Sequence, residues 1–191
     1  MALKRTNRDL TELESRIGYH FKNRSLLEQA LTHVSALKAP VKAEDHYERL
    51  EFVGDRVLGM VIAEMLCRIF PSEDEGHLSR RLAALVRKES CADVAESWGV
   101  SPFIRLGVGV MQSGLRKKGV LLGDLCEALI AAIYLDGGYD AAKRVVEHGF
   151  GEKLHQSHAA RRDAKSMLQE WALGRGLPVQ AFLKREGVEE L

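Results

Sequence analysis

The spacing of the apolar residues constrains the fold most, because they recur every three to four positions through most of the chain. This is the period of an amphipathic helix, whereas the strict alternation of a half-buried strand is rare here. We therefore expect an all-α fold over most of the chain. The sequence predicts helices over residues 9–18, 24–36, 46–69, 90–98, 120–135 and 139–155, with a further long helix starting near Leu78.

The predicted helix over residues 46–69 carries three acids among apolar residues. At about 100° per residue, Glu48, Glu51 and Asp55 fall within an arc of roughly 60°. An isolated buried carboxylate is costly, so either this edge of the helix is solvated or something positive lies beside it.

The predicted helix over residues 120–135 repeats the arrangement. Asp124 and Glu127 are i, i+3 neighbours on a helix that is otherwise almost entirely apolar. If the two acidic edges face one another, their carboxylates repel unless a cation lies between them. Oxygen ligands without histidine or cysteine suit Mg²⁺, Mn²⁺ or Ca²⁺. The pattern therefore favours a metal-dependent phosphodiesterase or phosphatase, because Mg²⁺ commonly acts on substrate phosphates.

The alternative is that these acids are solvated or paired with arginines. The candidate partners are Arg49, Arg56, Arg80 and Arg81. A single acid on a helix is usually explained in this way. Two separate acidic edges, on the two most apolar helices, favour the metal site.

Composition excludes several other classes of protein. The net charge is only +1, so binding of nucleic acid requires positive charge that is concentrated locally.

The three cysteines, Cys67, Cys91 and Cys126, lack CxxC spacing, and we expect reduced core thiols in a cytoplasmic protein. No signal peptide is expected at the N-terminus. The longest apolar run, residues 128–135, is too short to span a membrane, so no membrane association is expected.

The segment HYERLEFVGDRVL, which begins at His46, resembles the signature of the ribonuclease III family. Four further blocks resemble this family in the same order and at similar spacing: residues 17–35, 75–86, 113–118 and 123–138. Together they cover roughly residues 10–155. The resemblance implies a helical-bundle nuclease domain that forms a homodimer and hydrolyses double-stranded RNA with Mg²⁺, for which Mn²⁺ can substitute. It also implies 5′-phosphate and 3′-hydroxyl ends with short 3′ overhangs, and a role in rRNA and mRNA processing.

The resemblance also implies the residues of the active site. The metal ligands of the family match Glu51, Asp124 and Glu127, and its catalytic acids match Asp55 and Glu127. Because every one of these positions is acidic here, the resemblance implies an active enzyme rather than a non-catalytic RNA-binding or assembly protein on the same scaffold.

Four further residues are expected to support the site. Glu48 and Glu75 match two accessory acids of the family. Phe52 is apolar and lies beside the acids, and we assign it to the dimer interface rather than to the core of the protomer. Gly54 either lets another helix approach closely or is simply a tolerated helix glycine.

RNA contacts are expected from two places. The basic loop Arg116, Lys117 and Lys118 either contacts RNA phosphates or is solvated. We expect a nuclease domain over residues 1–155, a linker over 156–162 and a partial double-stranded RNA-binding domain over 163–191. The last segment resembles only the first helix and strand of that α/β domain, through natural shortening or an altered reading frame, so we expect weaker and more salt-sensitive RNA binding than in full-length relatives.

Overall fold

The chain divides into two compact units, residues 1–158 and 159–191. The computed structural model describes residues 9–37, 42, 45–107, 118–156 and 174–175. The predicted linker, 156–162, and the partial RNA-binding domain, 163–191, lie almost entirely outside the described residues. These two boundaries therefore stay predictions.

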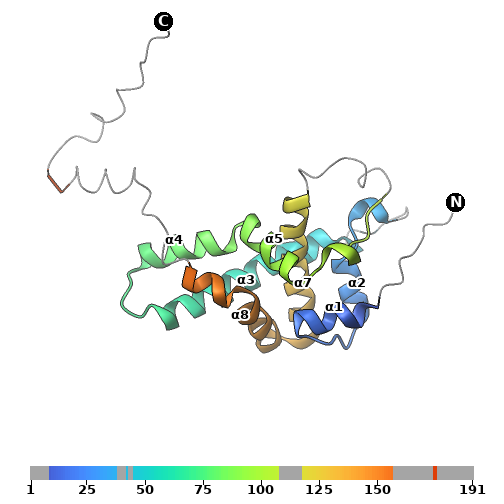
Figure 1. The fold of residues 1–191 in the computed structure, drawn as a ribbon, viewed down its shortest axis with the longest axis horizontal. Helices are drawn as coiled ribbons and strands as arrows, with labels where there is room; N and C mark the ends of the chain where they lie inside the picture. The colour runs from blue at the N-terminus through green and yellow to red at the C-terminus, as the bar shows by residue number, and fades with distance from the viewer. Residues whose placement is uncertain (1–8, 38–41, 43–44, 108–117, 157–173, 176–191) are drawn as a thin grey trace, which may run out of the picture. The chain divides into compact units, whose positions relative to one another are not determined.

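The described part of the first unit is helical and contains no strand, which confirms the expected all-α fold (Figure 1). Its elements are α1 (Leu10–Ile17), α2 (Arg24–Ala30), the 3₁₀ turn η1 (Val34–Ala36), α3 (Tyr47–Ile69), α4 (Glu75–Val86), α5 (Lys88–Ser97), the 3₁₀ turn η3 (Ser101–Phe103), α7 (Lys118–Gly137) and α8 (Tyr139–Gln156). None of the helices in these described ranges is long and apolar enough to cross a membrane.

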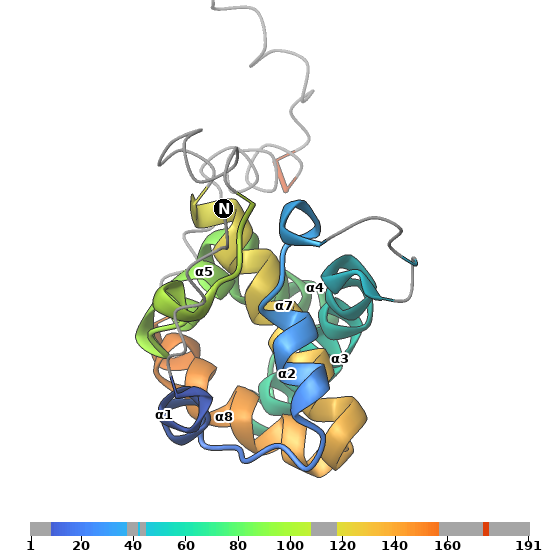
Figure 2. The same cartoon turned by 90° about the vertical axis from the view of Figure 1, so that its right-hand side faces the viewer.

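Helix α7 forms the centre of the bundle. Its residues from Leu125 to Ile133 are almost completely buried, as expected for a helix that is apolar on every side. It packs against α2, α3, α5 and α8, and Figure 2 shows it running between α3 and α5. The acids of α3 and α7 therefore lie at the most extensive helix contact of the unit.

The helix predicted over residues 24–36 is shorter in the structure, because α2 ends at Ala30. Thr32 instead forms an isolated parallel β-bridge with Arg105. The Arg105 amide donates a hydrogen bond of 2.8 Å to the Leu31 carbonyl. A partner more than seventy residues away thus ends the helix, which local periodicity does not reveal.

Helices α4, α5 and α7 begin earlier than predicted, α7 by two residues at Lys118. Helix α4 starts at Glu75 rather than near Leu78, because the Asp74 side chain accepts a hydrogen bond from the His77 amide at 2.8 Å and caps the helix. Helix α5 starts at Lys88 instead of residue 90. This second difference brings a lysine into the first turn of α5.

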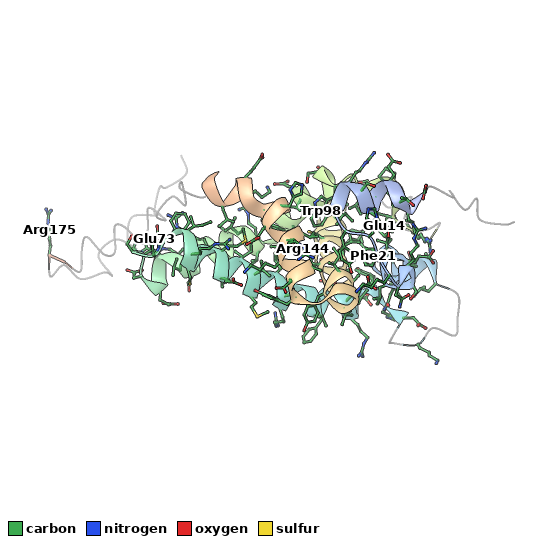
Figure 3. All side chains as sticks on the ribbon, turned by 90° about the horizontal axis from the view of Figure 1, so that it is seen from below. Glu14, Phe21, Glu73, Trp98, Arg144 and Arg175 are labelled. Atoms are coloured by element: carbon green, nitrogen blue, oxygen red, sulfur yellow. The ribbon has the colours of Figure 1, made fainter. Side chains whose placement is uncertain are left out.

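A buried acid outside the predicted site holds α1 to the segment that follows it. Glu14 is only 2% exposed and accepts hydrogen bonds from the Phe21 amide at 2.9 Å and from the Arg24 guanidinium at 3.0 Å. Figure 3 shows Glu14 and Phe21 next to one another at α1. The burial of Glu14 is therefore structural, since its carboxylate replaces lost water contacts with an amide and a guanidinium.

The three cysteines are free thiols, but only two belong to the core. Cys91 and Cys126 are buried, as predicted, whereas Cys67 is exposed. Cys67 lies on the solvent side of α3, so the assignment of all three to the core was wrong.

Candidate metal and active site

Two glycines bring three helices close enough to build the site. A Cβ atom at Gly54 on α3 would lie 2.5 Å from the carbonyl carbon of Glu127 on α7, closer than real Cβ atoms approach. A Cβ atom at Gly123 on α7 would lie 2.7 Å from the carbonyl oxygen of Lys88, the first residue of α5. The close-approach interpretation of Gly54 is thereby confirmed. Helix α7 therefore contacts α3 where Glu127 meets Gly54, and it contacts α5 where Gly123 meets Lys88.

Three carboxylates converge on the ammonium group of Lys88. Its Nζ lies 2.7 Å from Glu51 Oε1, 2.5 Å from Asp124 Oδ1 and 2.9 Å from Glu127 Oε2. These are the three acids predicted to bind metal, and they come from both acidic helices. The acidic edges of α3 and α7 therefore face a common point, as the sequence predicts.

Glu127 is the most buried acid of the group. The residue is 2% exposed, and its second oxygen, Oε1, lies 4.0 Å from the thiol sulfur of Cys91. Burial raises the pKa of Glu127 to about 7, although the hydrogen bond and charge of Lys88 oppose this rise. The negative charges of Asp55 and Glu51 raise the pKa further. An additional positive charge nearby would therefore stabilise the ionised form of Glu127.

Lys88 responds in the opposite direction. Partial burial lowers its pKa, but its hydrogen bonds to Asp124, Glu51 and Glu127 outweigh burial and raise the pKa above the usual lysine value. The side chain is 38% exposed, so the ammonium group lies between the buried carboxylates and solvent. Lys88 is therefore charged in the folded protein at neutral pH.

Asp55 lies one helical turn beyond Glu51 and takes a different position. Its carboxylate forms an ion pair with Arg56, and its side chain is 40% exposed. Its charge nevertheless raises the pKa of Glu127, which shows that the two acids interact electrostatically. Asp55 is therefore more exposed than the three acids that contact Lys88.

The two predicted accessory acids have other hydrogen-bond partners. Glu48 Oε2 lies 3.1 Å from Nδ1 of His46. Glu75, in the first turn of α4, accepts a hydrogen bond of 2.7 Å from the hydroxyl of Ser79. These contacts do not lead to the cluster, so an accessory role for either acid stays a prediction.

Phe52 does not belong to the core of the protomer. Its side chain is 67% exposed, and the Arg56 guanidinium lies 5.4 Å from its ring centre. It also lines a shallow surface hollow together with His46, Glu48, Arg49 and Val53. This exposure is compatible with the predicted dimer interface, which itself stays a prediction.

The predicted RNA-contacting residues cannot be placed at this site. Arg116 and Lys117 lie outside the described residues, as does the side chain of Lys118. Their expected contact with RNA stays a prediction.

Sequence reasoning missed Lys88 as the partner of the acids. Of the arginines proposed as alternatives, Arg56 does pair with Asp55. Glu51, Asp124 and Glu127 contact the lysine instead. Lys88 is 37 positions from Glu51 and follows an ordinary amphipathic helix. The only local signal is a cation at the start of a helix, the end where the helix dipole disfavours it.

The chemistry of the cluster fits a hard divalent cation. Its donors are carboxylate oxygens, which suit Mg²⁺ and Mn²⁺. When all three carboxylates are ionised, the single ammonium group leaves two of their negative charges unbalanced. Among the described residues, no group of three or more acids, histidines or cysteines is already arranged to hold a metal ion. A metal ion that bound the same three carboxylate oxygens would have to replace the ammonium group.

Comparison with known proteins identifies the family of the chain. A family model described as ribonuclease-III-like matches residues 23–154. The chain is 51% identical over 174 residues to ribonuclease 3 of Bradyrhizobium diazoefficiens, a match that covers 91% of this chain and 70% of that protein. It is 50% identical over 174 residues to ribonuclease 3 of Azorhizobium caulinodans, with 91% and 74% covered.

A solved structure shows the same fold. The nuclease domain of ribonuclease III from Campylobacter jejuni superposes with a TM-score of 0.67 at 39% sequence identity, covering 75% of this chain and 99% of that chain. The resemblance of the signature segment, the helical fold and the extent of these matches lead to one conclusion. The chain belongs to the ribonuclease III family of endoribonucleases.

Proposed function

We propose that Glu51, Asp124 and Glu127 form the Mg²⁺ site of an endonuclease that cuts double-stranded RNA, with Mn²⁺ able to replace Mg²⁺. One observation carries the proposal: carboxylates from α3 and α7 converge within hydrogen-bond distance of a single cation. The ribonuclease III family is in general dependent on divalent metal, which supports this assignment.

The burial of Glu127 favours the binding of a cation at this site. A carboxylate with a pKa of about 7 is held in its charged form best by a nearby cation. Glu51 and Asp124, which are less buried, complete the ligand set from two different helices. When bound, the ion supplies Lewis-acid stabilisation of the scissile phosphate and makes a water molecule more acidic.

Asp55 acts on the proton of the attacking water. It interacts with Glu127 but is more exposed than the three ligands, so it can orient a water molecule and accept its proton. Its side chain is 40% exposed, so water can reach this carboxylate. Glu48 and Glu75 would support the site as accessory acids.

The substrate and products follow from the family. Hydrolysis would leave a 5′-phosphate and a 3′-hydroxyl, with short 3′ overhangs when two protomers each cut one strand, in the processing of rRNA and mRNA. Exposed Phe52 would join the protomers. The region involved in dimer formation is described for the similar Campylobacter jejuni nuclease domain, which supports such a pairing. Arg116, Lys117 and Lys118 would contact RNA phosphates, and the free thiols suit a cytoplasmic location.

Cleavage of a labelled RNA duplex tests this proposal. The parent chain and the Glu127→Gln variant are each incubated with duplex in Mg²⁺, and the parent also in Ca²⁺. We expect cleavage only by the parent in Mg²⁺, with 5′-phosphate ends. If the parent leaves the duplex intact in Mg²⁺, the chain is instead the non-catalytic RNA-binding or assembly protein that the same scaffold also allows.

A further inference from the structure

Lys88 occupies a position that is unfavourable for a lysine unless the carboxylates are present. It is the first residue of α5, and its neighbour Arg87 caps this helix without a side-chain hydrogen bond. The start of a helix carries a partial positive charge, so cations are stabilised at the opposite end. The three carboxylates offset this repulsion, and they also explain why the side chain turns toward α7.

The main chain of Lys88 is held by α7, whereas its ammonium group lies close to solvent. The carbonyl of Lys88 packs against Gly123, one residue before Asp124, at a contact that leaves no room for a Cβ atom. The side chain is 38% exposed and has four methylene groups, so its ammonium group can reach solvent without movement of the helix. Lys88 can therefore leave the carboxylates while α5 and α7 stay in contact.

We propose that Lys88 is a built-in cation that holds Glu51, Asp124 and Glu127 together before metal binds, and that a divalent cation displaces its ammonium group. This inference rests on the proposed metal site. It makes Lys88 a positioning residue, because it acts through the three ligands.

Competition for the same oxygen atoms explains why displacement is favourable. The ammonium group balances one of the three carboxylate charges and leaves two unbalanced, whereas a divalent cation in its place balances two and leaves only one. Lys88 thus has two opposite effects on the site. It keeps the carboxylates assembled when metal is absent, and it lowers the apparent affinity for metal because its contacts must first be broken.

Substitution of Lys88 by methionine separates these two effects. Met keeps the unbranched side chain up to the position of Cε but has no charge. Lys153→Met is a matched control, because Lys153 forms an ion pair with Asp93 at 2.7 Å. The full chain is first depleted of metal with EDTA, and its melting temperature is measured. Binding of Mn²⁺ is then measured by titration calorimetry and by the electron paramagnetic resonance signal of free Mn²⁺.

We expect Lys88→Met to lower the melting temperature of the metal-free chain more than Lys153→Met does. We also expect it to bind Mn²⁺ about fivefold more tightly than the parent, or better, the lower end of usual coupling between two ligands. Lys88→Gln serves as a second uncharged variant if Lys88→Met does not fold. Equal or weaker Mn²⁺ binding by the folded variant, or an unchanged metal-free melting temperature, would overturn the inference.

The parent and Glu127→Gln distinguish this failure from failure of the proposed function. If the parent binds Mn²⁺ and Glu127→Gln binds it much more weakly, the metal site is correct and the Lys88 variants alone decide the inference. If both bind Mn²⁺ equally, or neither binds it, the metal site is wrong and the role of Lys88 falls with it.

Discussion

Replacement of Gly54 by alanine tests whether the contact between α3 and α7 assembles the site. The added Cβ atom would lie 2.5 Å from the carbonyl carbon of Glu127 and 3.1 Å from its Cα atom. Favourable carbon contacts begin at about 3.5 Å, and the carbonyl oxygen of Glu127 lies even closer to the added atom than the carbonyl carbon does. The helices must therefore separate by about 1 Å or more at this crossing. The atoms in the way belong to the backbone of a buried helix and cannot turn aside.

The cost of this separation follows from two opposing effects. Overpacking of a core costs up to about 3 kcal/mol, and a clash with backbone belongs at the upper end of that range. Alanine is favoured over glycine within a helix by about 1 kcal/mol, which offsets part of the cost. We therefore expect the free energy of unfolding to fall by about 2 kcal/mol, which lowers the melting temperature by roughly 4–8 °C in a chain of this size.

Thermal unfolding in EDTA at one fixed protein concentration measures this effect. Gly151→Ala on α8 is the matched control, because a Cβ atom there meets nothing within 4 Å, and we expect it to be neutral or slightly stabilising. The separation also moves Glu51 away from Glu127, so Gly54→Ala is expected to bind Mn²⁺ more weakly than the control. A melting temperature for Gly54→Ala that equals or exceeds that of the parent would show that the close contact does not exist.

Three other substitutions test separate parts of the site. Phe52→Ala should shift sedimentation from dimer toward monomer, because an exposed ring would lose its place in the interface; an unchanged dimer would refute this placement. Asp55→Asn should lower cleavage of duplex RNA by about a hundredfold or more while Mn²⁺ affinity stays close to that of the parent, and a large loss of affinity would make Asp55 a ligand instead. For Glu127, burial raises the pKa from 4.5 to about 7, so the folded metal-free chain binds a proton more tightly than the unfolded chain. Its contribution to stability is complete below about pH 4.5 and is lost as the pH rises to about 7. In urea unfolding in EDTA, the free energy of unfolding of the parent should therefore fall relative to that of Glu127→Gln across this pH window. A constant difference would contradict the raised pKa.

The sequence predicts the parts of this fold that depend on local pattern. Helices α3 and α7 appear close to their expected bounds, since long and strongly apolar periods leave few other ways to bury them. The convergence of Glu51, Asp124 and Glu127 is also predictable, because acids on two buried helices must share an environment that compensates their charge.

Contacts between distant segments were not predictable in the same way. The β-bridge of Thr32 with Arg105 ends α2, and no period of the sequence indicates it. Lys88 and Gly123 become meaningful only once α5 packs on α7, because a lysine at a helix start and a glycine inside a helix also occur where no site is built. The same holds for buried Glu14, whose partners Phe21 and Arg24 lie beyond the end of its own helix.

The most direct measurement is a crystal structure of the full chain grown with Mn²⁺, in which anomalous scattering locates the ion. We expect an anomalous peak within bonding distance of carboxylate oxygens of Glu51, Asp124 and Glu127, with the Lys88 ammonium group turned away from them. A peak elsewhere, or a Lys88 ammonium group still bound to all three carboxylates in crystals saturated with Mn²⁺, would contradict it.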